Sequence, residues 1–197
     1  MISRGGENMK RWPVDFRKLV GFFEKNKDIL HLSKYHLEGF ETHCLLVIGL
    51  MMEQYEAGAV SEEALIAACL HDIAKPRTAA LNKRNEACFY GHEKVTDEEL
   101  TEFLDHRYAG FEKVAALVRG HMLPLGIGES TPEPLRTKNR DRLNDFVRRY
   151  SHDKHFKDDL IILSDCDIRA SVKSEDELPA AELKANFVRD RLLQISD

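Results

Sequence analysis

The chain has 197 residues, enough for one domain with a sizeable core, and 43% hydrophobic with 32% charged residues is typical of a globular protein. The formal net charge of -5 argues against a protein that coats nucleic acid non-specifically. No apolar stretch reaches the roughly 20 residues that a membrane-spanning helix needs, and the N-terminus lacks the apolar core of a signal peptide. The four cysteines form no CxxC pair. We therefore expect a cytoplasmic protein with reduced thiols and no membrane partner.

Helical periodicity runs through nearly the whole chain. Helices are predicted over residues 14–26, 42–57, 61–73, 92–104, 110–122, 135–150, 156–172 and 180–195. Gly58 is predicted to end the second helix, Pro76 to stop the third and Pro179 to open the last at its first position. We find no convincing strand pattern, and residues 78–91 and 123–134 are predicted to be loops.

The expected fold is therefore all-α, a single helical bundle with its site between helices. We expect an N-terminal helical extension over residues 1–34, with its first residues disordered, and the main domain over residues 35–175. The last segment, residues 176–197, is predicted to be a helix that packs on the domain or on a partner subunit, so a homodimer is one expectation.

Two adjacent polar residues, His71 and Asp72, end the apolar run of residues 64–70 and stand shortly before Pro76. Burying either side chain without a polar partner costs about 2 kcal/mol or more. A metal ion satisfies an imidazole and a carboxylate at once. The pair therefore predicts a site for a divalent metal, of the kind that hydrolases use.

Further residues of metal-ligand type occur at intervals along the chain: His43 before the pair, and His92, His121 and Asp167 after it. Asp72, His121 and Asp167 each follow apolar residues at helical spacing, so each points toward the core. A single buried histidine is more often a hydrogen-bonded core residue than a ligand. Two aspartates and four histidines together favour a metal site, because aspartate is rarely buried without a partner.

The order of His43, His71-Asp72 and Asp167 resembles the HD superfamily of metal-dependent phosphohydrolases. The local sequence is similar to one branch, the HD domain of bacterial tRNA nucleotidyltransferases, in residues 36–43 (HLEGFETH), 68–76 (ACLHDIAKP) and 89–93 (FYGHE). The resemblance covers roughly residues 35–172. It does not include the nucleotidyltransferase head, because no Gly-Ser turn is followed by a strand with paired aspartates. The resemblance thus implies a free-standing HD domain.

The resemblance also implies a cofactor of one or two divalent ions. A first ion would be held by His43, His71, Asp72 and Asp167, and Asp72 would bridge to a second ion held by His92 and His121. In a one-metal enzyme His121 would contact phosphate instead. Mixed imidazole and carboxylate ligands suit Mn, Fe, Co, Ni or Zn, and Mg less well.

The last ligand has an alternative, Asp165, two residues before Asp167. Asp167 is preferred because it fits the apolar stripe of its helix better. It also precedes the run Ile-Arg-Ala, which is similar to the short run after the family's final aspartate.

The expected chemistry is attack on a phosphate ester by water activated at the metal. Asp72 would orient the water, and Lys75, which leaves the helix on the same side, would bind the substrate phosphate. Arg77 and Tyr90 are further substrate-binding candidates, for phosphate and for a base. For each of these side chains, an ordinary surface or packing role is the alternative.

The favoured substrate is a nucleotide-type phosphomonoester or a 2',3'-cyclic phosphodiester. The expected partners are therefore a phosphorylated small molecule, a nucleotide or an RNA end. One alternative is a hydrolase of a nucleoside triphosphate or a signalling nucleotide, and another is a non-catalytic metal- or nucleotide-binding module, because a fold does not choose among such functions.

Overall fold

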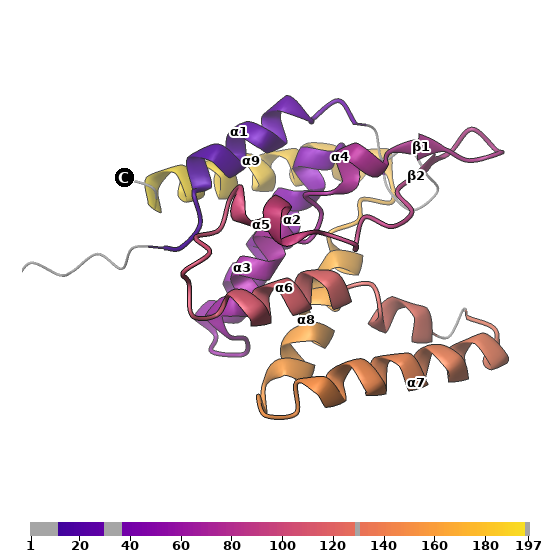
Figure 1. Cartoon of the computed structure of the whole chain (residues 1–197). Coiled ribbons are helices and arrows are strands. Elements are labelled where there is room, and N and C mark those ends of the chain that lie inside the picture. The colour runs from indigo at the N-terminus through magenta and orange to yellow at the C-terminus, as the bar shows by residue number, and fades with distance from the viewer. Residues whose placement is uncertain (1–11, 30–36, 129–130, 196–197) are drawn as a thin grey trace, which may run out of the picture.

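The computed structural model describes residues 12–29, 37–128 and 131–195, and most of them are helical (Figure 1). The α-helices are α1 (Phe16–Lys25), α2 (Phe40–Glu56), α3 (Glu62–Leu70), α4 (Lys75–Thr78), α5 (Asp97–Thr101), α6 (Phe111–Gly120), α7 (Glu133–Arg149), α8 (Phe156–Arg169) and α9 (Leu178–Ile195). Two 3-10 helices, η1 (Pro124–Ile127) and η2 (Glu175–Glu177), and two strands, β1 (Ala80–Leu81) and β2 (Ala87–Cys88), complete the described part. The predicted all-α fold class is confirmed.

Helix α3 lies at the centre of the bundle. Residues 64–70 of this helix are all buried, because it packs against α2, α6 and α8 on different sides. An all-round apolar surface is what such a central helix requires. Both polar residues that follow it, His71 and Asp72, are therefore carried into the interior.

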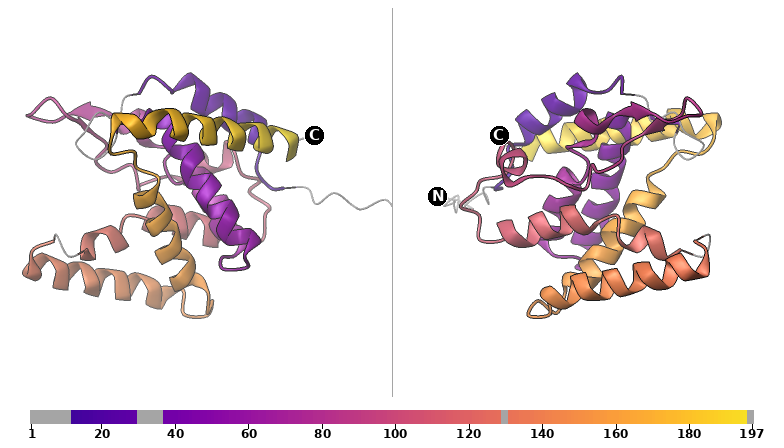
Figure 2. Two further views of the ribbon diagram at one scale, coloured as in Figure 1. Left: turned by 180° about the vertical axis from the view of Figure 1, so that it is seen from behind. Right: turned by 45° about the vertical axis from the view of Figure 1, so that its right-hand side comes forward.

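The C-terminal helix α9 packs on the domain itself. It crosses α2 and lies beside α1 (Figures 1 and 2), and it buries Ala181, Ala185, Val188 and Leu192. At the opposite end of the molecule, the long helix α7 lies against η1 and buries only Leu143 fully. The polar remainder of α7 agrees with its place at the surface.

A buried polar cluster fixes α8, which carries Asp167, to the neighbouring helices. Asp159 accepts hydrogen bonds from the Ser61 amide (3.0 Å) and the Ser61 hydroxyl (2.7 Å) at the start of α3. The Lys113 ammonium of α6 lies 2.8 Å from Asp159 and 2.6 Å from Asp153. Since Asp159 is only 1% exposed, these contacts compensate the burial of its charge. Ser61 also caps α3, as predicted, by accepting from the Ala64 amide.

Helix α3 ends earlier than predicted, at Leu70 rather than at residue 73. The His71 ring nitrogen Nδ1 lies 2.8 Å from the Ala68 carbonyl, which in a continuing helix would accept from the amide of residue 72. The chain then turns through residues 71–74 before the short helix α4. The side chain of His71 thus helps to end the helix that carries it.

Other predicted boundaries were wrong as well. The helix expected over residues 156–172 ends at Arg169, and the loop expected over residues 123–134 contains η1 and the first residues of α7. The helix expected over residues 92–104 is shorter, because Thr96 and Glu99 form a capping box that starts α5 at Asp97. Pro179 is the second residue of α9, not the first. Gly58 follows the C-cap of α2 with a φ of +71°, a left-handed conformation that agrees with its predicted role at the end of that helix.

The expected loop over residues 78–91 contains a β-hairpin, which corrects the prediction of no strands. Ala80 pairs with Cys88 and Leu81 with Ala87 in an antiparallel register. The Asn82 side chain accepts from the amides of Arg84 and Glu86 and so shapes the tip. Two residues per strand are too few to show an alternating pattern in the sequence.

Residues 1–11 and 30–34 of the predicted N-terminal extension, and residues 35 and 36 of the predicted main domain, lie outside the described residues. Among the helices that the structure does describe, none is both long and apolar enough to cross a membrane.

Candidate metal centre

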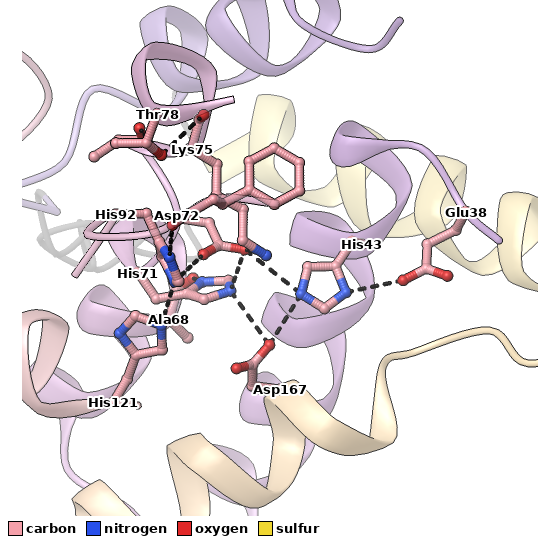
Figure 3. Close-up of polar contacts among 12 residues, drawn as sticks. Glu38, His43, Ala68, His71, Asp72, Lys75, Thr78, His92, His121 and Asp167 are labelled. Carbon is pink, nitrogen blue, oxygen red and sulfur yellow. Dashed lines mark hydrogen bonds and ion pairs between the residues drawn. The ribbon is translucent and has the colours of Figure 1, made fainter. Parts of the chain in front are cut away.

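Six predicted ligands converge in the interior, brought together from five parts of the chain (Figure 3). They come from the first turn of α2 (His43), the end of α3 (His71 and Asp72), the turn after β2 (His92), the end of α6 (His121) and the last turns of α8 (Asp167). Each is at most 8% exposed. The helical bundle therefore serves to place residues 124 positions apart, such as His43 and Asp167, in contact.

The six residues form two groups that share Asp72. In each group the potential ligand atoms all lie within 4.8 Å of one another, and the members are His43, His71, Asp72 and Asp167 in the first and Asp72, His92 and His121 in the second. The Nε2 atom of His43 lies 3.0 Å from Asp167 Oδ1, and that of His71 lies 3.1 Å from Asp72 Oδ2. On the other side, His92 Nε2 lies 3.4 Å from Asp72 Oδ1.

All four histidines turn their Nδ1 atoms outward and their Nε2 atoms toward the centre. The Nδ1 atoms of His71, His92 and His121 lie 2.8, 2.8 and 2.6 Å from the carbonyls of the residues three positions earlier. A carbonyl accepts only from N–H, so Nδ1 carries the proton and Nε2 keeps its lone pair in each neutral ring. Such an arrangement presents metal-binding nitrogens on one side.

Several ligand atoms lack hydrogen bonds. Within the part of the chain that the structure describes, His71 Nε2 and Asp72 Oδ1 are buried and make no hydrogen bond, and Asp72 Oδ2 has the Lys75 ammonium as its ion-pair partner. Buried polar atoms are almost always hydrogen-bonded, so an unsatisfied cluster of this kind calls for an explanation. A divalent cation satisfies imidazole nitrogen and carboxylate oxygen together, and the donor set present fits such an ion.

The electrostatics of the cluster keep its carboxylates ionised. Burial opposes the charged form of Asp72, but the neighbouring His71 and Lys75 hold the pKa of its carboxyl well below the usual range. The pKa of Asp167 is lowered as well, against its burial, by the hydrogen bond and charge of His43. Burial lowers the pKa of His121 to about 4, which leaves that imidazole neutral and available as a ligand at neutral pH.

The HD domain family model matches residues 40–169 of the chain, about two thirds of its length, and this span contains all six residues of the cluster. The chain belongs to the HD-domain family. HD domains characterise a superfamily of metal-dependent phosphohydrolases, so the predicted membership is confirmed. No curated protein and no solved structure matches the chain. The likeness to the tRNA nucleotidyltransferase branch stays a prediction.

The side chain of Lys75 points toward the cluster of predicted ligands. Its ammonium lies 2.5 Å from Asp72 Oδ2 and 5.5 Å from the centre of the Phe89 ring, and the residue is 7% exposed. Although burial opposes the charge, the carboxylates of Asp72 and Asp167 raise the pKa of the amine, so it stays protonated. A permanent cation thus borders the first ligand group.

The other predicted residues lie farther from the cluster. The Arg77 guanidinium pairs with Glu99 and donates to the Lys94 carbonyl at 2.8 Å. Tyr90 is 83% exposed beside the hairpin. Asp165 is exposed and pairs with Arg169 at 3.4 Å, whereas Asp167 faces His43. Of the two aspartates, the structure places Asp167 at the cluster.

Sequence reasoning gave no role to Glu38, which the structure places behind His43. Its Oε1 atom lies 3.2 Å from His43 Nδ1, and the residue is 2% exposed. A glutamate five residues before a ligand histidine matches no helical spacing. Only its place in the segment that resembles the HD family gave a signal.

Proposed function

We propose that this HD domain is a metal-dependent phosphohydrolase that acts on a nucleotide-type phosphomonoester or a 2',3'-cyclic phosphodiester. The observation that carries the proposal is the position of Asp72. Its two oxygens face two ligand groups, and Lys75, a buried cation, stands next to it. A site for metal binding alone has no need of that lysine, whereas a site for phosphate does.

The residues His43, His71, Asp72 and Asp167 would hold one divalent ion, and Asp72, His92 and His121 could hold a second. An ion bound there supplies Lewis acidity, which lowers the pKa of a coordinated water and neutralises charge on phosphoryl oxygens. His121 is neutral with its proton on Nδ1, so its Nε2 could instead accept a hydrogen bond from the substrate if only one ion binds.

The remaining chemistry belongs to side chains of the protein. Lys75 attracts the phosphoryl group by its charge, and its contact with Asp72 holds it in place before substrate arrives. Asp72 is ionised, so its oxygens can accept a hydrogen bond from the attacking water and orient it. Because the site is buried, these charges act at low dielectric, where they influence a reacting phosphate more strongly than in water.

The choice of substrate rests on the likeness of residues 36–43, 68–76 and 89–93 to the tRNA nucleotidyltransferase branch. That likeness favours an RNA end or a nucleotide over other phosphate esters. The exposed ring of Tyr90, two residues before His92, offers a surface on which a base could stack.

The test is metal content together with turnover. Protein purified without chelator would be assayed with Mn, Ni, Co and Mg on p-nitrophenyl phosphate, bis-p-nitrophenyl phosphate and 2',3'-cyclic AMP, with nucleoside triphosphates alongside. Asp167→Asn should abolish turnover. The matched control is Asp165→Asn, on the same helix but exposed and paired with Arg169, and it should retain turnover.

The outcomes separate the candidate functions. Turnover of the monoester or the cyclic diester that is lost only in Asp167→Asn supports the proposal. Turnover of triphosphates alone identifies the alternative hydrolase. Bound metal without turnover of any ester would refute the proposed enzymatic function and favour a non-catalytic metal-binding module.

Two variants test the proposed contacts with substrate. Tyr90→Ala should raise KM for 2',3'-cyclic AMP but not for p-nitrophenyl phosphate, because only the nucleotide carries a base. Arg77→Ala tests the predicted phosphate contact. An unchanged KM would show that the pairing of Arg77 with Glu99 is its whole role.

A further inference from the structure

One of the four histidines in the cluster is oriented in a different way from the others. The rings of His71, His92 and His121 donate to backbone carbonyls three residues earlier. The Nδ1 atom of His43 instead faces a carboxylate, Oε1 of Glu38, at 3.2 Å. Both side chains of this pair are completely shielded from solvent.

For the three histidines at helices, the position relative to the helix explains the difference, whereas His92 lies in the turn after β2. His71 and His121 follow the last residues of α3 and α6, where carbonyls have no partner within the helix and are free to accept from a ring. His43 lies in the first turn of α2, where carbonyls accept from the amides of the helix. An acceptor for its Nδ1 therefore has to come from outside the helix, and Glu38 supplies it.

We propose that Glu38 is a positioning residue that orients His43 for metal binding and links it to the end of α8. Its Oε2 atom accepts from the Val172 amide at 2.9 Å, three residues beyond the C-terminus of α8. Two donors thus meet the two oxygens of one buried carboxylate. The helix that carries His43 and the helix that carries Asp167 are joined behind the ligands by this one side chain.

The proposal rests on the metal site of the proposed function but not on any reaction. With Nδ1–H held by Glu38, the Nε2 atom of His43 is the one that faces Asp72 and Asp167, at 3.5 and 3.0 Å. A carboxylate acceptor also makes the imidazole a stronger ligand, and loss of such a partner typically weakens metal affinity 10- to 100-fold. Only the first ligand group contains His43, so the effect should be confined to it.

The experiment is a double-mutant cycle read by Mn²⁺ affinity, followed by the EPR signal of free Mn²⁺. Glu38→Gln keeps the size of the side chain but offers one oxygen to two donors. It should weaken Mn²⁺ binding at the first ligand group, the one that contains His43, 10- to 100-fold. In a His43→Ala background the same change should have almost no further effect, because its partner is gone. A purely structural role through Val172 would give additive losses in affinity instead.

The matched control is Glu41→Gln. Glu41 is also a buried glutamate at the start of α2, but its carboxylate lies 2.8 Å from Arg189 of α9 rather than at a ligand. The control should leave Mn²⁺ affinity within about twofold of the wild type. Circular dichroism before each titration shows that the variants are folded.

A second measurement needs no variant. In protein loaded with Zn²⁺ and labelled with ¹⁵N-histidine, the ring of His43 should keep a proton on Nδ1 and carry the metal on Nε2. Metal on Nδ1, or equal Mn²⁺ affinities for Glu38→Gln and the wild type, would overturn the proposal for Glu38. Metal binding without turnover would refute the proposed function only, so the two failures are distinguishable.

Discussion

Lys75→Met is the perturbation that most directly tests the reasoning about charge in the cluster. The Lys75 ammonium lies 2.5 Å from Asp72 Oδ2 in a buried setting. At an effective dielectric constant of about 20 the gross attraction is about 7 kcal/mol, much of which offsets desolvation. Removing one partner of a buried pair typically costs 3–5 kcal/mol, because the other charge is left behind.

The lower end of that range applies here. Burial and the charge of Lys75 disfavour protonation of His43, but the hydrogen bonds that its ring donates to Asp167 and Glu38 raise its pKa to about 9. His43 therefore supplies a second positive charge 3.5 Å from Asp72 in the metal-free protein. We expect metal-free Lys75→Met to lose about 3 kcal/mol of unfolding free energy.

Bound metal should remove most of this loss, because the ion then compensates Asp72. By linkage, the variant should bind metal about 3 kcal/mol more tightly, which is roughly 100-fold, even though its turnover falls. Urea unfolding with EDTA and with saturating Mn²⁺ measures both states. The control is Lys83→Met, on the exposed tip of the hairpin. An equal loss of stability with and without metal, or weaker metal binding, would refute the reasoning.

Three further predictions concern the packing of the helices around the site and the pH dependence of metal binding and stability. Asp159→Asn should cost roughly 1–3 kcal/mol in urea unfolding, because an amide offers a single oxygen where Ser61 presents two donors and Lys113 keeps only Asp153 as its partner, and a loss under 1 kcal/mol would contradict this. Gly120→Ala should cost roughly 1–3 kcal/mol by thermal unfolding, because a Cβ there would lie 2.5 Å from the Phe146 ring; unchanged stability would show that α7 shifts freely. Metal must displace a proton from His43, whose pKa is about 9, so Mn²⁺ affinity should rise about tenfold per pH unit between pH 7 and 8. Protonated His43 stabilises the metal-free protein, fully below the unfolded-state pKa of about 6.5 and progressively less as pH rises toward 9. With rising pH, the unfolding free energy of the metal-free protein should therefore fall while Mn²⁺ affinity rises.

Much of the fold and the membership of the site followed from the sequence because both rest on local patterns. Apolar periodicity gave the main helices, and polar residues on apolar faces, such as His121 and Asp167, marked the interior. Boundaries were less predictable where a side chain ended or started a helix, as His71 and Thr96 do. The hairpin was missed because its strands have two residues each.

The sequence by itself therefore determined that the chain is helical, that it carries the ordered HD ligands and that those ligands are buried. Only the tertiary structure decided that Asp72 is shared by two groups, that Asp167 rather than Asp165 faces His43, and that Arg77 turns to Glu99. It also revealed Glu38 behind His43. The physical reason is that periodicity fixes which face of a helix is buried, whereas contacts such as that between residues 38 and 172 depend on how separate helices pack.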